Sequence, residues 1–407
     1  MSETPFYQRH ARRACAVCGS TASKLLFRQT FSEMSSGSLL QGYDVAVCEE
    51  CGFGFADHIP NQADFDAHYR DMSKYEYQDQ GGKETEYDLV RFRAMTDTII
   101  LFLPSSNARL LDVGCATGRL LALFKEKGYG NVIGLDPSPV CAQAAQSLYG
   151  IRVLTGAVSE IGKVIAREPP FDCVILSGVL EHIRDVQQAL VHMRRLLAKG
   201  GLLFVEVPDA TDFARWPDAP FQEFSTEHIN FFSTTSLENL LRRYGFVKVL
   251  SQQIPRDQTF GTVMPVVMAI YRKEANIQPT TPVRDTQTEP GLRDYIRKSQ
   301  EVENKIQQKI DVLVENARPI MVWGVGTHTL HLLTTSHLPE ANIQAFVDSN
   351  PRYQGKQLND LPVLTPSDLQ NRTEAILISS RVFQSAIEQQ IRDELKLNNA
   401  VIKLYEV

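Results

Sequence analysis

Four cysteines near the start of the chain have the spacing of a metal site. Cys15-x2-Cys18 and Cys48-x2-Cys51 are separated by 29 residues, and a glycine follows each pair. Each pair aims two sulfurs at one point, and four thiolates fill the tetrahedron that Zn²⁺ prefers. A closed site leaves no position for Lewis-acid chemistry, so we expect Cys15, Cys18, Cys48 and Cys51 to hold a structural zinc. Two disulfides are the alternative, which a reducing compartment disfavours.

A second group of residues with chemical potential surrounds position 114. The stretch "LLDVGCATGRLL" follows an apolar strand candidate and opens a helix candidate. Gly114 and Gly118 allow a tight turn that brings the backbone close to a ligand. Asp136, in "VIGLDPSP", ends the next strand candidate, where a carboxylate can accept hydrogen bonds from both hydroxyls of a ribose. The full G-x-G-x-x-G of dinucleotide-binding turns is missing from this stretch.

These residues resemble the class I S-adenosylmethionine (SAM) methyltransferases, and "LSGVLEHIRDVQQALVHMRRLLAKGGLLFVEVP" continues the same pattern. The resemblance implies that Asp112 and Gly114 shape the pocket for the methionine end of SAM and that Asp136 holds its ribose. Ala157 departs from many relatives, which have an acid there for the adenine. A Rossmann domain for another nucleotide cofactor is the alternative. The donor-binding set that the resemblance implies is Asp112, Gly114, Cys115, Gly118, Asp136, Pro137, Ser177 and Gly178.

The whole chain also resembles the three-domain sugar C-methyltransferases of deoxysugar biosynthesis. These enzymes act at C3 of a 4-keto nucleotide-linked sugar, typically dTDP-linked. The resemblance rests on "CAVCG…CEECG", "KYEY", "LDVGCATG", "GLDPSP", "LEHIRDV" and "STEHINFFS". It implies that His228 is the proton acceptor and Glu227 its neighbour, that His182 lies at the same pocket, and that Tyr75 or Tyr77 faces the sugar.

The chemistry of such a site follows from its residue types. An imidazole can deprotonate a carbon next to a ketone if the resulting enolate is stabilised, and histidine titrates near neutral pH. The enolate carbon then attacks the methyl group in line. Ser225, however, occupies the place of the tyrosine in the family's Tyr-x-Glu-His run. Methylation of an oxygen or nitrogen on a sugar or carbohydrate-like metabolite therefore remains an alternative.

A second glycine turn lies near the end of the chain. "PIMVWGVGTHTLHLL" reads as strand, turn and helix, and Asp348 ends the next strand candidate. Alone, this pattern indicates a nucleotide-binding domain, so an NAD(P)-linked oxidoreductase is an alternative of another class. In the resembled family the domain forms a wall of the nucleotide-sugar site, which is the interpretation we favour. A scaffold protein that has lost catalysis is the third possibility.

The elements that must position these residues divide the chain. Strand candidates alternate with helix candidates from residue 106 onward, which predicts an α/β fold: a class I methyltransferase Rossmann-like core, with a small zinc module before it and a second Rossmann-like domain after it. The expected parts are a zinc module (1–65), a helical connector (66–105), a methyltransferase domain (106–274), a linker with a helix (275–317) and a C-terminal domain (318–407).

Composition bounds the partners. The chain has 407 residues, 43% of them hydrophobic and 22% charged, with a net charge of −6. An acidic balance argues against a nucleic-acid partner, and no apolar run is long enough to span a membrane. The N-terminal residues lack the apolar core of a signal peptide, so we expect a cytoplasmic protein that acts on a small molecule. Its oligomeric state, monomer or dimer, does not follow from the sequence.

Overall fold

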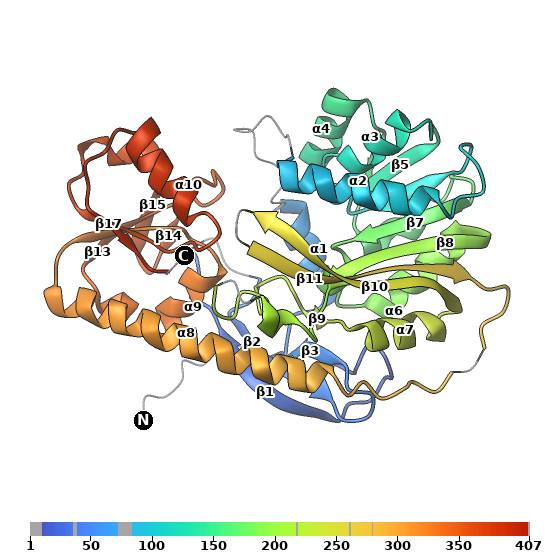
Figure 1. Cartoon of the computed structure of the whole chain (residues 1–407), viewed down its shortest axis with the longest axis horizontal. Coiled ribbons are helices and arrows are strands. Elements are labelled where there is room, and N and C mark those ends of the chain that lie inside the picture. Colours follow the sequence, from blue (N-terminus) through green and yellow to red (C-terminus); the bar gives the residue numbers. More distant parts are fainter. Residues whose placement is uncertain are drawn as a thin grey trace.

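The computed structural model describes residues 10–35, 39–71, 84–216, 219–259, 262–278 and 280–405. These residues form three sheets, one for each of the sheet-containing parts expected from the sequence (Figure 1). In the described residues, no helix is long and apolar enough to cross a membrane.

The first sheet contains the four cysteines at its end. Its strands are β1 (Ser23–Thr30), β2 (Gly42–Cys48), β3 (Gly54–Asp57) and β9 (Asn230–Phe231), all antiparallel in the order β1-β2-β3-β9. Every residue of β2 is buried, because this strand lies between β1 and β3 and several of its side chains pack into the core that also contains helix α8. We call β1–β3 with the two cysteine turns the thiolate module. Strand β9 was not expected from the sequence, and it joins residues near 230 to this module.

The second sheet is mostly parallel and has seven strands in the order β10-β11-β8-β7-β4-β5-β6. Its five parallel strands are apolar runs of the kind that sheets covered on both faces require. Strand β11 runs antiparallel to both neighbours. The bounds are β4 (Leu110–Val113), β5 (Val132–Asp136), β6 (Val153–Thr155), β7 (Phe171–Ser177), β8 (Leu197–Pro208), β10 (Phe246–Thr259) and β11 (Thr262–Lys273).

Helices cover both faces of this sheet (Figure 1). On one face, α2 and α3 pack through Met95, Ile99, Leu120 and Phe124. On the other face, α6 and α7 pack through residues such as Leu190. The helices are α1 (Gln62–Asp71), α2 (Glu86–Ile100), α3 (Arg119–Glu126), α4 (Pro139–Tyr149), α5 (Ile161–Val164), α6 (Val186–Leu196) and α7 (Thr234–Arg243). The expected helical connector thus contains α1 and α2, and α1 begins four residues before it at Gln62.

The third sheet has the order β14-β15-β13-β12-β16-β17, and all its pairs except β14–β15 are parallel. Its strands are β12 (Ile320–Trp323), β13 (Ile343–Val347), β14 (Gln357–Leu358), β15 (Leu361–Leu364), β16 (Ala375–Ile378) and β17 (Val401–Lys403), with helices α9 (Thr327–Thr335) and α10 (Gln384–Gln389). The strands expected around residues 320, 345, 376 and 402 are confirmed, and β14 and β15 are additional.

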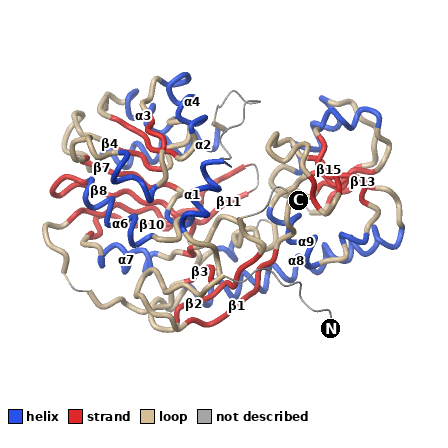
Figure 2. The backbone as a smooth tube through the Cα atoms, turned by 180° about the vertical axis from the view of Figure 1, so that it is seen from behind, coloured by secondary structure: helices blue, strands red, loops and turns tan. Residues whose placement is uncertain are grey.

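One long helix, α8 (Thr288–Asn316), ties the parts together. Figures 1 and 2 show it running from the central part to the C-terminal part, beside the thiolate module. Its residues Leu292, Tyr295, Ile306 and Ile310 share one buried core with Tyr43 of the thiolate module and with strand β12. The helix begins within the segment expected to be a linker, because its first turn docks on Asp285 through Thr288.

Candidate functional site

The four cysteines converge as their spacing predicts. The Sγ atoms of Cys15 and Cys51 are 3.5 Å apart and those of Cys18 and Cys48 are 3.4 Å apart. Gly19 and Gly52 donate 2.9 Å hydrogen bonds back to Cys15 and Cys48, with φ of +85° and +80°, so both turns have the same shape. Four sulfurs within 4.8 Å of one another fit a tetrahedral metal with no open position.

The predicted donor turn lies at the carboxyl edge of the central sheet. Gly114 and Gly118 have φ of +74° and +78°, and a Cβ on Gly114 would lie 2.8 Å from a methyl group of Val179. The carboxylate of Asp136 accepts 2.9 Å hydrogen bonds from the backbone amides of Ala116 and Ser138. This carboxylate thereby fixes the turn, and a carboxylate has further lone pairs for a ligand.

Burial sets the charge of the two acids beside this turn. It raises the pKa of Asp112 to about 8, helped by the neighbouring charge of Asp136 and opposed by Arg91. Burial also raises the pKa of Asp136 to about 6, against the two backbone amides that stabilise its charged form. At neutral pH, Asp136 is therefore mostly ionised, whereas Asp112 is mostly neutral.

The remaining residues of the predicted donor set surround this turn. Ser177 and Gly178 end the neighbouring strand β7, and Gly178 has φ of +68°. Pro137 is half-buried beside Asp136. The thiol of Cys115, in contrast, packs into the core with Leu121 and Ala145, so only its backbone faces the turn region.

Ala116 occupies a left-handed conformation in the same turn, with φ of +46°. Such a conformation disfavours any residue with a Cβ, so Ala116→Gly should raise the free energy of unfolding by about 0.5–1 kcal/mol. Urea unfolding measures this change. Ala122→Gly in helix α3 is the control, and it should lower stability by about 1 kcal/mol or more. Equal losses in both variants would contradict the expected strain at Ala116.

A charged network that the sequence does not predict lies next to Ser177. Arg91 of α2 donates 2.7 Å hydrogen bonds to Ser177 Oγ and to Glu206, whose side chain is 1% exposed. Arg256 of β10 pairs with the same carboxylate. Burial, followed by the charge of Arg91, lowers the pKa of Arg256 to about 8. Two guanidinium groups thus share one buried carboxylate, and the charges of Asp88 and Glu181 also act on Arg256.

Glu84 is a further residue that motif reasoning missed. Its carboxylate accepts a 2.5 Å hydrogen bond from Thr117 in the donor turn and a 2.6 Å bond from the hydroxyl of Tyr149 in α4. The residue immediately precedes the N-cap of α2, Thr85. Glu84 therefore connects the start of α2 with the donor turn. The sequence does not predict this contact, because Glu84 and Thr117 are 33 positions apart in the chain.

Two histidines lie together beyond the end of β7. His182 and His228 have ring centroids 5.0 Å apart, with ring planes at 66°. Nδ1 of His182 is 3.0 Å from the hydroxyl of Tyr69 and 3.1 Å from the backbone carbonyl of Glu227. Nδ1 of His228 is 3.7 Å from the carboxylate of Glu223. The structure thus brings together two imidazoles whose Nδ1 atoms each face a polar partner.

One tyrosine beside His182 was not among those predicted from the sequence. Tyr75 and Tyr77 lie outside the described residues, and the structure places Tyr69 of α1 against His182. Burial, followed by the charges of Glu227 and Glu181, raises the pKa of Tyr69 well above its usual value, so its hydroxyl stays protonated. Glu227 contributes its carbonyl to His182, while the carboxylate near His228 comes from Glu223.

Ser225, which replaces the tyrosine of the resembled family, shapes the turn that bears His228. Its Oγ accepts hydrogen bonds from the backbone amides of Glu227 and His228 at 3.2 and 3.0 Å. The hydroxyl of Tyr43, from β2, donates a 2.9 Å bond to the Ser225 carbonyl. The thiolate module therefore contacts this turn directly.

A second group in the described residues could hold a metal ion. Glu181, His182 and His228 each offer a ligand atom within 4.8 Å of the others, and Nε2 of His182 is 3.8 Å from the Glu181 carboxylate. That distance is longer than the 3.4 and 3.5 Å between the paired sulfur atoms of the cysteines. The residue types of this group suit either a divalent cation or acid–base chemistry.

The turn in the C-terminal part repeats the hydrogen-bond pattern of the donor turn. Asp348 accepts 2.8 Å bonds from the backbone amides of Val325 and Asn350. Gly324 has φ of +114° and donates to the Val347 carbonyl. Asp348 thus lies at a strand end, as the sequence predicts, and both of its oxygens serve the turn.

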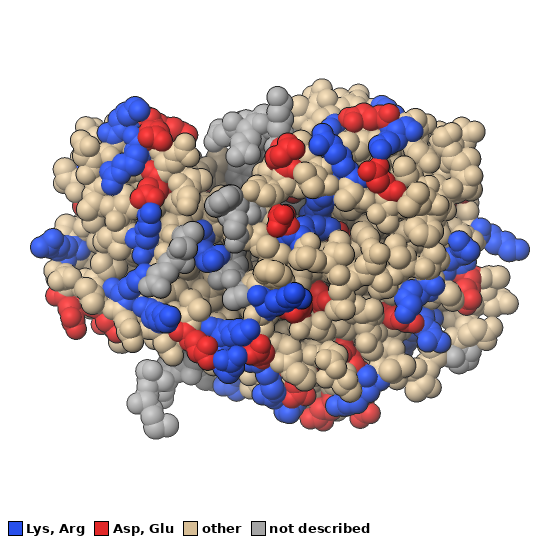
Figure 3. Space-filling view, in the orientation of Figure 1, with Lys and Arg blue, Asp and Glu red and all other residues tan. Residues whose placement is uncertain are grey.

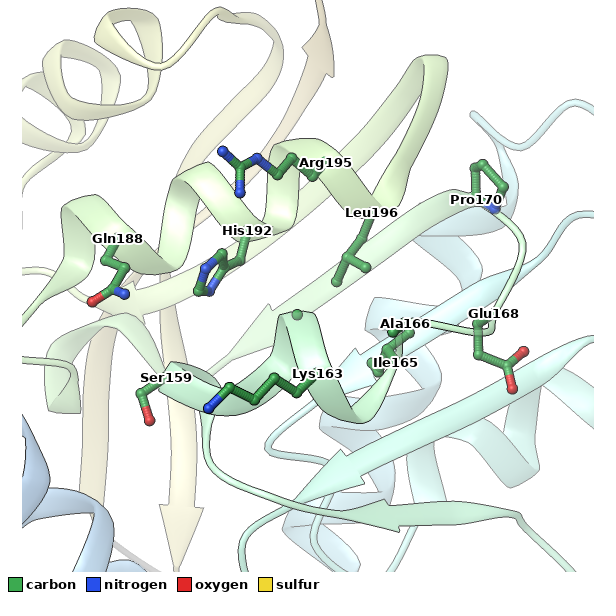
Figure 4. Close-up of a pocket in the computed structure, with 11 residues that line it drawn as sticks. Ser159, Lys163, Ile165, Ala166, Glu168, Pro170, Gln188, His192, Arg195 and Leu196 are labelled. Carbon is green, nitrogen blue, oxygen red and sulfur yellow. The ribbon is translucent and has the colours of Figure 1, made fainter.

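A groove lies on the surface of the described residues between α5 and α6. Its volume is about 600 Å³. Figure 4 shows Lys163, His192 and Gln188 among the residues that line it. None of the predicted site residues lines it. His192 is half-buried there. Figure 3 shows basic and acidic side chains interspersed over the face of the molecule seen in Figure 1.

Comparison with known proteins places two segments in described families. Residues 87–251 match the family described as "Methyltransferase domain", and residues 316–402 match the family described as "C2185-like, N-terminal". Over 343 residues, the chain is 24% identical to the C-methyltransferase NovU of Streptomyces niveus, covering 82% of this chain and 78% of that protein. Over 195 residues it is 24% identical to the malonyl-[acyl-carrier protein] O-methyltransferase of Paenibacillus sp. (strain JDR-2), covering 44% and 70%.

Among solved structures, one similar chain is the 1,6-didemethyltoxoflavin-N1-methyltransferase of Burkholderia thailandensis, with bound 1,6-didemethyltoxoflavin and S-adenosylhomocysteine. It is 23% identical with a TM-score of 0.40, and the match covers 56% of this chain and 97% of that chain. The family match over 87–251 decides between the alternatives for the central sheet: it has a class I methyltransferase Rossmann-like fold, not that of another nucleotide-binding domain.

Proposed function

The chain is a SAM-dependent methyltransferase, and we propose that it methylates a nucleotide-linked sugar at a carbon next to a 4-keto group. The observation that carries this proposal is the pair His182 and His228, which lies beyond the same strand end, β7, that borders the donor turn. The similarity to a C-methyltransferase over most of the chain supports carbon as the acceptor atom.

His228 is the proposed base. Its Nδ1 faces the Glu223 carboxylate at 3.7 Å, which leaves Nε2 to take the proton. The electrons of the broken C–H bond move into the enolate, whose oxygen needs a hydrogen-bond donor. Two candidates are His182, whose ring lies beside that of His228, and Tyr69, which contacts His182 and stays protonated because of its raised pKa. These two replace the tyrosine that the family has at position 225.

Glu223 has a separate part in the proposed proton transfer. When His228 takes a proton, the imidazolium gains a carboxylate partner at 3.7 Å, which stabilises the charged state. The side chains of His228 and Glu223 are 20% and 13% exposed, so solvent screens this pair only partly.

SAM, when bound, supplies a methyl group on a positively charged sulfur. We propose that the turn at Gly114 lets the backbone approach it, that Asp136 accepts hydrogen bonds from the ribose hydroxyls, and that Arg91, beside Ser177, faces the carboxylate end of the donor. The chain then aligns donor and acceptor, which is most of the catalytic task in a displacement at carbon.

Asp136→Asn tests the donor site. Loss of a charged acceptor for two hydroxyls should weaken S-adenosylhomocysteine binding by roughly 10–100-fold in calorimetry. Because the pKa of Asp136 is about 6, wild-type affinity should also weaken as the pH falls through 6, and this pH dependence should disappear in the variant. Asp172→Asn, at the opposite end of β7, is the control and should bind normally. Unchanged affinity in both variants would remove Asp136 from the donor site.

The acceptor atom is tested with a panel of nucleotide sugars in deuterated water. A 4-keto sugar such as dTDP-4-keto-6-deoxyglucose should exchange deuterium next to its carbonyl without SAM, and should gain a methyl group on carbon when SAM is added. Methylation of a hydroxyl or amine without exchange would instead support the alternative, an O- or N-methyltransferase. The similarity to an O-methyltransferase and the serine at position 225 keep that alternative in the test.

The C-terminal part is proposed to form a wall of the acceptor site. A dinucleotide cofactor there is the competing hypothesis, because Asp348 repeats the pattern of Asp136. Thermal shift with NADH separates the two: stabilisation by S-adenosylhomocysteine but not by NADH supports the wall.

A further inference from the structure

The segments that bear the two histidines are joined by one side chain, that of Asn230. This residue is 2% exposed, and its Nδ2 donates hydrogen bonds to the carbonyls of Leu180 at 2.8 Å and Ile183 at 2.7 Å. The two carbonyls flank Glu181 and His182 in the chain. A third bond, from the amide of Ile229 to the carbonyl of Glu181 at 2.9 Å, runs beside them. The loop before β9 is thus fastened to the loop after β7.

Arg13 holds the amide of Asn230 in the orientation that these bonds require. Its guanidinium donates hydrogen bonds to Asn230 Oδ1 at 2.9 Å and to the Ile229 carbonyl at 2.5 Å. An amide whose oxygen faces a guanidinium must present its NH₂ group to the other side, where the two carbonyls lie. Arg13 is 7% exposed and stacks over the ring of Phe55 in β3 at 5.1 Å.

The position of Arg13 is fixed by the thiolate module. Its backbone amide donates a 2.9 Å hydrogen bond to Asp57 at the end of β3, and Cys15 follows two residues later. The same strand β3 pairs with β9 at Phe55 and Asn230. A continuous chain of contacts therefore runs from the cysteine turn through Arg13 and Asn230 to both histidine loops.

We propose that Asn230 is a positioning residue for methyl transfer and that Arg13, acting through it, couples the thiolate module to the histidine pair. The proposal rests on the proposed function of His182 and His228. Asn230 fixes the distance between the two rings by joining their loops on either side of His182. Arg13 holds the Asn230 amide in the orientation in which its hydrogen bonds to Leu180 and Ile183 form. A displacement of about 1 Å in such a pair costs on the order of 100-fold in rate.

Arg13→Gln is the test, and Arg12→Gln is its matched control. Arg12 is the neighbouring arginine, 57% exposed, and it bonds to Asp57 and Ser23 within the thiolate module. With SAM and dTDP-4-keto-6-deoxyglucose, Arg13→Gln should lower kcat by roughly 10–100-fold. The affinity and stoichiometry of S-adenosylhomocysteine binding should stay within about twofold of wild type. Arg13→Lys keeps a donor and should recover part of the loss.

A second readout needs no acceptor. The imidazole NMR signals of His182 and His228 should both move in Arg13→Gln and in Asn230→Asp, and neither should move in Arg12→Gln. Asn230→Asp removes the two N–H donors with little change in size. If the wild type methylates none of the sugars, the proposed function fails, and these signals still decide the positioning role.

Two results would overturn the proposal. Wild-type kcat and unmoved imidazole signals in Arg13→Gln would show that the joint does not position the histidines. A fall in kcat matched by an equal fall in S-adenosylhomocysteine stoichiometry would show that the substitution only reduces the folded fraction.

Discussion

Replacing His228 with alanine should lower turnover by about 10²–10⁴-fold while the affinity for S-adenosylhomocysteine stays unchanged. The reason is that the imidazole is proposed to remove the proton, whereas the donor contacts come from the turn at Gly114 and from Asp136. Turnover is measured as methyl transfer to the 4-keto sugar, and donor affinity by calorimetry. The same variant should lose deuterium exchange next to the carbonyl, because exchange needs the base but not SAM.

Controls separate the base from its surroundings. His337→Ala removes an exposed histidine in the C-terminal part and should leave both measurements unchanged. Glu223→Gln keeps the imidazole but removes its carboxylate partner, so it should lower turnover less than His228→Ala does. Exchange and turnover like those of wild type in His228→Ala would exclude His228 as the base. Loss confined to His182→Ala would transfer that role to His182.

The donor turn could be predicted from the sequence because its parts are close together in the chain. Asp112 is the last residue but one of β4, Gly114 and Gly118 form the turn into α3, and Asp136 ends the next strand. Parallel strands bring their carboxyl ends to one edge, so the hydrogen bond from Ala116 to Asp136 follows from the topology. The cysteine turns are local in the same sense, and each closes on its own glycine.

Of the proposed acceptor site, the sequence indicates only the two histidines that the structure brings together, because the other groups come from distant segments. Tyr69 reaches His182 from α1, and no local pattern marks this tyrosine among its neighbours. Arg91 of helix α2 and Arg256 of strand β10 both form ion pairs with Glu206 of strand β8. Strand β9 is only two residues long, too short for any period to show. Such contacts depend on how the helices and strands pack against one another. The types of the residues alone do not determine that packing.

Ser225 illustrates how a substitution changes meaning once the fold is known. In the sequence, Ser225 stands where the resembled family has a tyrosine, so a phenol hydroxyl is missing at that position. In the structure, its Oγ accepts hydrogen bonds that close the turn bearing His228. The hydroxyl that a tyrosine would supply comes near the histidines from Tyr69 instead. A site can therefore keep a donor while moving it to another element.

The second large effect is expected from the thiolates. Elemental analysis of the full chain should find about one zinc per molecule, and chelation under reducing conditions should abolish methyl transfer. Zinc bound by such a set contributes on the order of 10–16 kcal/mol in small zinc domains, more than the module's small sheet can replace. Loss of the metal should unfold the first ~65 residues, which limited proteolysis detects. Because Tyr43 and Gln29 bond to the carbonyls of Ser225 and Phe224, the turn bearing His228 should then lose its support.

Cysteine variants locate the metal. Cys51→Ser should lower the zinc content well below one and reproduce the effect of chelation, whereas Cys141→Ser, a buried thiol at the start of α4, should keep one zinc and full activity. A metal-free protein that stays folded and active would overturn the structural role of the cluster. A content near two that returns to one in His228→Ala would place a second ion on Glu181, His182 and His228, and His228 would then be a ligand rather than the base. The expected result is one zinc per chain that is retained in His228→Ala and lost in Cys51→Ser. This result would support both the cysteines as ligands of a structural zinc and His228 as the base, because the metal would then not be bound by the imidazole.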